Sequence, residues 1–280
     1  MNTSRRCLFL TTIIRDCLAA VHAIFNHFTS YNMVYTIDLT GGTVVVTGGN
    51  RGIGYAISEA AASAGANIAI LFHSHPKAHE AAETLAKKHG VKVKAYQADV
   101  GDSKLVKETI DKIEKDLGTP ITGLAANAGV SVVKPATELT TEDFHKVFNA
   151  NVLGAFNVSQ AVAQYWIQRQ KKGSIVITSS MSSNIFYNSS KGAVTNMVKG
   201  LAAEWAPHGI RVNALEPGFC ETEQTSGMDS KIRDWQAASV PLRRFSKPQE
   251  QGDAALWLLS DKATYVTGAG YLVDGGFSAY

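Results

Sequence analysis

Tyr187 and Lys191 are the residues whose types and spacing first suggest chemistry, since the lysine follows the tyrosine by four positions. In a helix, this spacing places both side chains on one face, one turn apart. A tyrosine with an ordinary pKa near 10 is a poor acid–base catalyst at neutral pH, and a nearby lysine charge favours the phenolate. The pair therefore predicts proton transfer to or from a carbonyl or hydroxyl group. Isolated Tyr-x3-Lys pairs are also common on helices, so the surrounding motifs are needed to tell a catalytic pair from an ordinary one.

A glycine-rich turn supplies the first such context. The stretch Thr43–Gly54, TVVVTGGNRGIG, reads as a strand, a turn and the start of a helix. Glycines let the backbone turn tightly and approach a diphosphate, which then lies against the helix N-terminus. The spacing Gly-x3-Gly-x-Gly differs from GxGxxG, but the strand–turn–helix context favours cofactor binding over a turn used only for packing. The predicted contacts are Gly48, Asn50, Arg51, Gly52, Ile53 and Gly54.

The end of the second predicted strand indicates which nucleotide is bound. It reads ILFHSHPKA, with no acid to accept the ribose 2′-hydroxyl of NAD. His73 and Ser74, with Arg51 from the glycine turn and Lys77 as a further candidate, suit a 2′-phosphate instead. NADP(H) is therefore the predicted cofactor. The alternative is that the histidines here only face solvent, and their irregular spacing predicts no metal site.

Two further strand ends carry candidate cofactor contacts. Asp99 and Val100 follow the third strand, where the carboxylate could accept from the adenine amino group or simply cap a helix. Asn127, Ala128 and Gly129 follow the fourth strand. Small residues there allow a close approach to the cofactor, and the asparagine amide can tie neighbouring strands together.

Strands and helices alternate along the rest of the chain. Strands that are apolar on both faces and alternate with helices predict an α/β fold, a single doubly wound Rossmann-type domain with a parallel seven-stranded sheet and helices on both faces. The expected strands are Thr43–Thr47, Ile68–Phe72, Val93–Ala98, Leu124–Ala126, Ser174–Thr178, Arg211–Leu215 and Tyr271–Val273. The expected helices include Leu105–Leu117, Phe144–Ile167 and Tyr187–Trp205.

Composition limits the classes of partner. The chain has 280 residues and a formal charge of +3, too mild to indicate nucleic-acid binding. Its 3 cysteines are scattered and predict no disulfide framework, so a reducing, cytoplasmic compartment is expected. No apolar run is long enough to span a membrane. The domain is expected at 39–280. Residues 1–38 would form a poorly ordered extension, an upstream start or, less favoured, a mitochondrial targeting segment.

Together these motifs resemble the short-chain dehydrogenase/reductase family. The resemblance covers residues 39–280 and, within the family, is closest to fungal NADP-dependent polyol and ketose reductases of the mannitol, arabinitol, sorbose and xylulose type. The matching stretches are TGGNRGIG at 47–54, Asp99, NAG at 127–129, Asn151, Ser180, YNSSK at 187–191, PGFCET at 217–222 and the closing YVTGAGYLVDGG.

The resemblance implies a role for each catalytic position. Tyr187 would be the acid/base and Ser180 would bind the substrate oxygen. Lys191 would also hold the nicotinamide ribose, and Asn151 would support a water relay to that lysine. Pro217, Gly218 and Thr222 would contact the cofactor, residues 223–245 would form a lid, and the enzyme would be a homotetramer.

One spacing departs from the family pattern. Ser180 precedes Tyr187 by seven residues, whereas the family usually has about a dozen, and Ser179 is an alternative to Ser180. A short loop could leave an open pocket, a segment could be missing near Ser183–Phe186, or the catalytic geometry could be impaired. The leading hypothesis is thus an NADP(H)-dependent oxidoreductase for a ketone and its secondary alcohol, for instance a polyol/ketose pair. The alternatives are a reductase that tailors a fungal specialised metabolite and a nucleotide-binding protein without turnover.

Overall fold

The computed structural model describes Tyr35–Ser180 and Ile185–Ala279. Residues 37–280 form one compact unit, and the description below concerns this unit alone. The extension expected over residues 1–38 lies almost entirely outside the described residues. Of the stretch Ser183–Phe186, where a segment could be missing, Ser183 and Asn184 also lie outside them.

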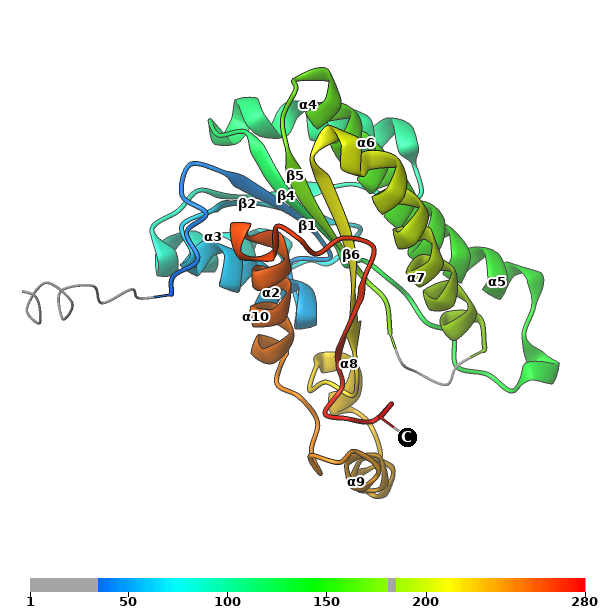
Figure 1. Ribbon diagram of the computed structural model, residues 1–280. Helices are drawn as coiled ribbons and strands as arrows, with labels where there is room; N and C mark the ends of the chain where they lie inside the picture. The colour runs from blue at the N-terminus through cyan, green and yellow to red at the C-terminus, as the bar shows by residue number, and fades with distance from the viewer. Residues whose placement is uncertain (1–34, 181–184, 280) are drawn as a thin grey trace, which may run out of the picture. The chain divides into compact units, whose positions relative to one another are not determined.

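A parallel sheet of seven strands forms the centre of the unit, in the order β3-β2-β1-β4-β5-β6-β7 (Figure 1). Every neighbouring pair runs parallel, which confirms the predicted doubly wound fold. The strands are β1 (Thr43–Thr47), β2 (Asn67–Phe72), β3 (Val93–Gln97), β4 (Ile121–Ala126), β5 (Gly173–Thr178), β6 (Ile210–Pro217) and β7 (Gly270–Val273).

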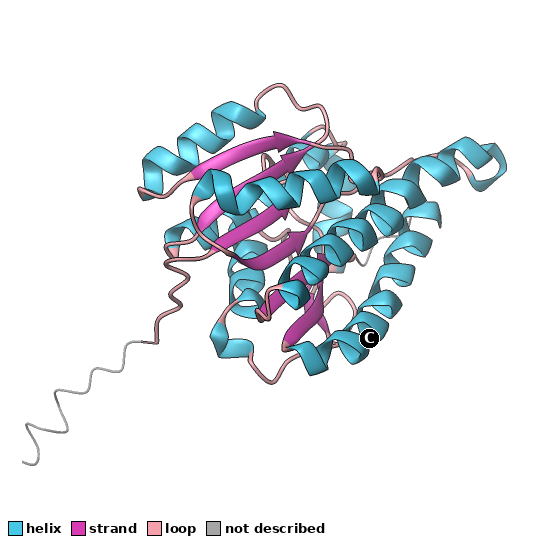
Figure 2. Cartoon of the chain, turned by 90° about the horizontal axis from the view of Figure 1, so that it is seen from above, coloured by secondary structure: helices cyan, strands magenta, loops and turns pink. Residues whose placement is uncertain are grey.

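Two layers of helices cover the sheet, as seen from above in Figure 2. One apolar core packs α2, α3 and α10 against one face, and the other packs α4, α6 and α7 against the opposite face. The strands are apolar on both sides because both faces are covered. The helices are α2 (Gly52–Ser63), α3 (Ala78–His89), α4 (Ser103–Leu117), α5 (Thr141–Phe148), α6 (Gly154–Gln168), α7 (Ile185–Trp205), α8 (Glu223–Ser226), α9 (Ser230–Ser239) and α10 (Pro248–Leu259).

The helix expected over Phe144–Ile167 has a different construction. It begins earlier, at Thr141, because Thr140 and Asp143 form a capping box. A π-helical turn over Asn149–Leu153 then separates α5 from α6. Such turns insert one extra residue and often occur at functional sites. Apolar periodicity does not reveal this turn, because the residues on both sides keep helical spacing.

The topology determines where a ligand site can lie. From β1 the chain moves outward through β2 to β3, then returns to β4 on the other side and continues to β7. The carboxyl ends of β1 and β4 therefore meet at a switch point, which is where open α/β sheets bind ligands. The short helices α8 and α9 follow β6 and fall within the predicted lid (Figure 1). Among the described residues, no helix is long and apolar enough to cross a membrane.

Packing between β5 and α6 generates a stability prediction. A Cβ atom on Gly173 would lie 2.3 Å from a ring carbon of Trp166, which is fully buried and whose Nε1 donates to the Ile121 carbonyl at 2.7 Å. Gly173→Ala should therefore lower the free energy of unfolding by about 1–3 kcal/mol in urea denaturation. Gly200→Ala is the control, since a Cβ there meets nothing within 4 Å and should stabilise α7 by about 0.5–1 kcal/mol. Equal losses for both variants would contradict the tight contact at Gly173.

Candidate active site

The predicted acid–base pair lies at the start of α7. Tyr187 falls in the first turn of the helix and Lys191 one turn later, on the same face. Lys191 is only 3% exposed, and its Nζ donates to the Thr178 carbonyl at the end of β5, 2.5 Å away. The same Nζ lies 5.5 Å from the centroid of the Tyr187 ring. The helix thus brings the two groups together as the spacing predicts.

Their titration differs from the expectation. Burial raises the pKa of the Tyr187 hydroxyl above its usual value, and a hydrogen bond with Ser180 offsets part of this rise. The Lys191 ammonium group faces the Tyr187 ring and the Thr178 carbonyl. Burial lowers the pKa of Lys191 itself to about 8. The pair is therefore a protonated tyrosine beside a lysine whose charge is costly to keep.

The two candidate serines have different surroundings. Ser180 hydrogen-bonds the Tyr187 side chain across the seven-residue spacing. Ser179 is 2% exposed, and its hydroxyl donates to the Lys191 carbonyl at 2.9 Å, behind the catalytic face. Ser180 is therefore the serine placed for chemistry, and Ser179 is an anchor for α7.

Asn151 lies in the π-helical turn and is fully buried. Its Nδ2 donates to the Val130 carbonyl and to the Ser190 hydroxyl, both at 3.0 Å, and its Oδ1 accepts from the Val130 amide at 2.8 Å. A Cβ atom on Gly129 would lie 3.2 Å from this Oδ1 and 3.6 Å from the Lys191 Nζ. Asn151 thus lies next to the lysine, and its side chain joins the strand β4 end to α7.

The glycine turn fits a diphosphate. A Cβ on Gly54 would lie 2.2 Å from the Gly48 carbonyl oxygen, so the first turn of α2 can approach β1 only without a side chain. Gly48 and Gly52 adopt the left-handed φ values of +66 and +54. The first turn of α2 contains no acid, and the buried Nδ2 of Asn50 has no partner among the described residues. Free backbone amides and an unpaired donor at a helix N-terminus are suited to an anion.

Next to this turn lies a cavity of about 960 Å³ at the ends of β2, β3 and β4. His73 and Ser74 border it, with His73 Nδ1 3.1 Å from the Ser74 hydroxyl and His73 Nε2 3.9 Å from the Asp99 carboxylate. Lys77 is not among its lining residues. The predicted cofactor residues on the wall are Gly48, Asn50, Arg51, His73, Ser74, Asp99, Val100, Ala128 and Gly129.

A smaller cavity of about 150 Å³ joins the cofactor turn to the catalytic pair. Tyr187, Lys191, Gly52, Ile53 and Thr222 all line it, and Asn127 does too. The Asn127 amide ties strands together as predicted, because its Nδ2 donates to the Thr47 carbonyl and its Oδ1 accepts from the Thr178 hydroxyl.

Pro217 and Gly218 line neither cavity. Gly218 instead bonds the Val273 carbonyl through its amide, and a Cβ there would lie 2.7 Å from the Asp274 backbone. These two residues shape the turn that carries Thr222. Sequence reasoning missed Thr178 and Thr47, the strand-end threonines that hold Lys191, Asn127 and Ala128. Each is the last residue of a buried strand, and this position could have identified them as candidates from the sequence.

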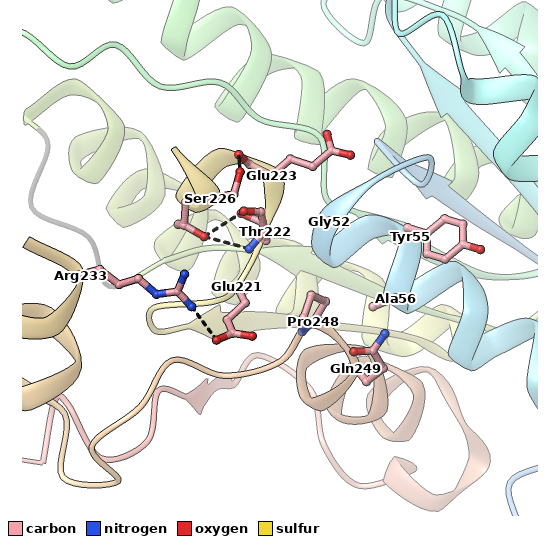
Figure 3. Close-up of a pocket in the computed structure, with 11 residues that line it drawn as sticks. Gly52, Tyr55, Ala56, Glu221, Thr222, Glu223, Ser226, Arg233, Pro248 and Gln249 are labelled. Atoms are coloured by element: carbon pink, nitrogen blue, oxygen red, sulfur yellow. Dashed lines mark hydrogen bonds and ion pairs between the residues drawn. The ribbon is translucent and has the colours of Figure 1, made fainter. Parts of the chain in front are cut away.

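A third cavity, of about 430 Å³, lies between α2, α8 and the start of α10 (Figure 3). Here Arg233 of α9 reaches the Glu221 carboxylate at 2.7 Å, and its guanidinium lies 5.4 Å from the Phe245 ring centroid. This ion pair tethers α9 to the turn that precedes Thr222. No metal-ligating cluster of His, Cys, Asp or Glu occurs in the described part of the chain.

Comparison with known proteins extends this description. A family model described as enoyl-(acyl carrier protein) reductase matches residues 48–278. Sorbose reductase of Schizosaccharomyces pombe is 36% identical over 254 residues, which are 88% of this chain and 99% of that protein. A probable NADP-dependent mannitol dehydrogenase of Yarrowia lipolytica is 38% identical over 260 residues, covering 89% of this chain and 91% of that protein.

The solved structures show the same likeness. Gluconate 5-dehydrogenase from Burkholderia cenocepacia, crystallised in complex with NADP and tartrate, superimposes with a TM-score of 0.81 and 32% sequence identity. The match covers 87% of this chain and 97% of the other. At 32% identity, the two proteins share the family as well as the fold.

The buried lysine predicts a pH-dependent stability. Burial lowers the pKa of Lys191 to about 8 from the ordinary 10.5, so between these values the unfolded chain holds a proton that the folded chain has lost. The free energy of unfolding should therefore rise with pH across this window. Lys191→Met removes the titration, so the stability of this variant relative to wild type should fall by about 2–3 kcal/mol between pH 7 and pH 10.

Urea denaturation at several pH values in this window measures that difference. Lys199→Met is the matched control, because Lys199 is an exposed lysine two turns further along the same helix. It should keep the pH dependence of the wild type. A constant difference between Lys191→Met and wild type from pH 7 to pH 10 would show that burial does not shift the lysine.

Proposed function

The chain belongs to the short-chain dehydrogenase/reductase family, and from this membership we propose that it is an NADP(H)-dependent oxidoreductase that interconverts a ketone and a secondary alcohol. The observation that carries the proposal is the small cavity that Tyr187 and Lys191 share with Gly52 and Thr222. In this one cavity, an acid–base pair lies next to a turn that is suited to a diphosphate. A protein that only binds a nucleotide would not need the acid–base pair in this space.

In the reducing direction, the hydride for the carbonyl carbon would come from NADPH bound along the glycine turn. Tyr187 donates its hydroxyl proton to the carbonyl oxygen. Burial raises the pKa of this hydroxyl, so it carries the proton at neutral pH but needs stabilisation of the phenolate to release it readily. Ser180, which already bonds Tyr187, orients the same oxygen. Lys191 would hold the cofactor ribose, and its charge would support the phenolate that forms. The hydrogen bond between Ser180 and Tyr187 supports a working arrangement of these two side chains.

NADP(H) is the proposed form of the cofactor. His73, Ser74 and Arg51 line the large cavity and offer donors to a 2′-phosphate, and no acid ends β2. Asp99 lies on the same wall and can accept from the adenine amino group. The name of the Yarrowia relative and the NADP bound to the Burkholderia enzyme support this choice.

The proposed substrate is a ketose or the corresponding polyol. The names of the two fungal relatives, a sorbose reductase and a mannitol dehydrogenase, support this class. Reduction of another ketone, such as a fungal specialised metabolite, is the alternative that a substrate panel separates. Assembly as a homotetramer and a cytoplasmic location stay predictions of the sequence.

Tyr187→Phe tests the catalytic proposal. The variant should lower kcat for NADPH-dependent ketone reduction by about 10²–10⁴-fold, because the proton donor is lost. NADPH should still raise its melting temperature, because the adenosine cavity is unchanged. The assay follows NADPH absorbance with ketoses, diketones and aromatic ketones, and the exposed Tyr265→Phe is the control. If wild type binds NADPH but reduces no member of the panel, the nucleotide-binding alternative replaces this proposal.

Ser74→Asp tests the cofactor. A carboxylate at this point repels a 2′-phosphate and accepts from a 2′-hydroxyl, so the preference for NADPH over NADH should fall by about tenfold or more. Dissociation constants from titration of protein fluorescence give the ratio directly. Ser63→Asp adds the same charge at the far end of α2 and should leave the ratio unchanged. An unaltered ratio in Ser74→Asp would remove Ser74 from the phosphate site.

A further inference from the structure

Thr178, the last residue of β5, and the two residues that follow it all contact the first turns of α7. The Thr178 carbonyl accepts from Lys191 Nζ, the Ser179 hydroxyl donates to the Lys191 carbonyl, and the Ser180 side chain bonds Tyr187. Three consecutive residues thus set where the catalytic turn stands relative to the sheet. The outer two act on the reactive groups, whereas Ser179 acts on the backbone of the helix.

Ser179 belongs to a longer chain of polar contacts. Its hydroxyl lies 2.9 Å from that of Thr195, and Thr195 in turn donates to the Glu216 carboxylate at 2.9 Å. Glu216 comes from β6, so the contacts cross from β5 through α7 to the next strand. We call Ser179, Thr195 and Glu216 the rear anchor, because they lie behind the catalytic face.

The number of hydroxyl hydrogens in the rear anchor shows why Glu216 matters to it, because it determines which acceptor Thr195 uses. Two hydroxyl hydrogens serve three short contacts. Thr195 lies four residues after Lys191, and a helical threonine readily donates to the carbonyl four residues before it. Glu216 takes the Thr195 hydrogen, so the Ser179 hydrogen is shared between the Lys191 carbonyl and the Thr195 hydroxyl oxygen. Without the carboxylate, Thr195 could bond within its own helix and the link to β5 would weaken.

The fold makes room for this carboxylate. Glu216 is half-buried and forms no ion pair among the described residues, although burying a charge is costly. On the neighbouring strand, a Cβ atom on Gly270 would lie 2.7 Å from Glu216 Oε1. A methyl group at this position would require the carboxylate to move from its place beside Thr195. The carboxylate thus lies beside the helix that carries the acid–base pair, with Thr195 as its hydrogen-bond donor.

We propose that Glu216 is a positioning residue, which acts through Thr195 and Ser179 to hold the Tyr187–Lys191 turn against the end of β5. The proposal rests on the proposed function, since it assigns Glu216 a part in the activity of that turn. It goes further in predicting that a side chain outside the cofactor and substrate cavities controls the rate.

The experiment compares Glu216→Leu, Glu216→Gln and Thr195→Val in the full-length protein. Glu216→Leu and Thr195→Val should each lower kcat about 10- to 100-fold, because a small misplacement of catalytic groups costs that much. Their double variant should lose no more than the worse single variant, because the residues share one chain. Glu216→Gln keeps an acceptor oxygen for Thr195 and should retain most of the wild-type rate.

Hydrogen exchange supplies a readout that does not depend on turnover. Amides of residues 187–195 should exchange faster in Glu216→Leu, while those of α4 stay as in wild type. Gly270→Ala should reproduce this pattern from another strand, by displacing the carboxylate. Gly173→Ala is the control for general destabilisation, because it perturbs the contact with Trp166 instead.

The outcomes separate the two proposals. If wild type reduces ketones but Glu216→Leu keeps its kcat and its exchange rates, the positioning role is wrong. It is also wrong if Glu216→Leu loses no more activity than Gly173→Ala, or if the losses of Glu216→Leu and Thr195→Val multiply. A wild type that reduces nothing overturns the proposed function instead, and the exchange of residues 187–195 then shows whether the rear anchor holds the helix.

Discussion

The burial of the Lys191 ammonium group is the constraint on which the rest of the site depends. An ammonium removed from water must find acceptors or lose its proton, and here the Thr178 carbonyl is the acceptor while the pKa falls to about 8. That requirement fixes the register of α7 against the end of β5. It also explains why Gly129, which has no side chain, faces the lysine.

The neighbouring elements follow from this placement. The π-helical turn rotates Asn151 inward, where its amide joins the backbone at Val130 to the Ser190 hydroxyl of α7. Asn127, held by Thr47 and Thr178, closes the same junction from the β1 side. Side-chain hydrogen bonds therefore join the ends of β1 and β5, the segment after β4, the π-helical turn and α7 around one buried charge. In a low-dielectric interior such bonds specify geometry strictly, because each broken one leaves an unpaired group.

The sequence predicts the architecture well because its signals are local. Thr43–Thr47 is buried at every position, so an apolar run bounded by glycines identifies the strand without further knowledge. The glycine turn and the Tyr-x3-Lys pair are equally local. The π-helical turn, the different environments of Ser179 and Ser180, and the raised pKa of Tyr187 depend on contacts between distant segments. Pro217 and Gly218 show the same limit, because the motif identifies their turn but not which of its residues reach the cavity.

The tether between Arg233 and Glu221 has a consequence for how the site opens. Both side chains are partly exposed, at 40% and 49%, so their attraction contributes only about 0.2–1 kcal/mol and weakens as salt is added. Thermal fluctuation at room temperature is enough to separate such a pair often. The attachment of α9 to this turn therefore varies in strength with ionic conditions, whereas the hydrogen bond of the buried Lys191 to the end of β5 does not. Added salt should free α9 without changing how Tyr187 and Lys191 are arranged.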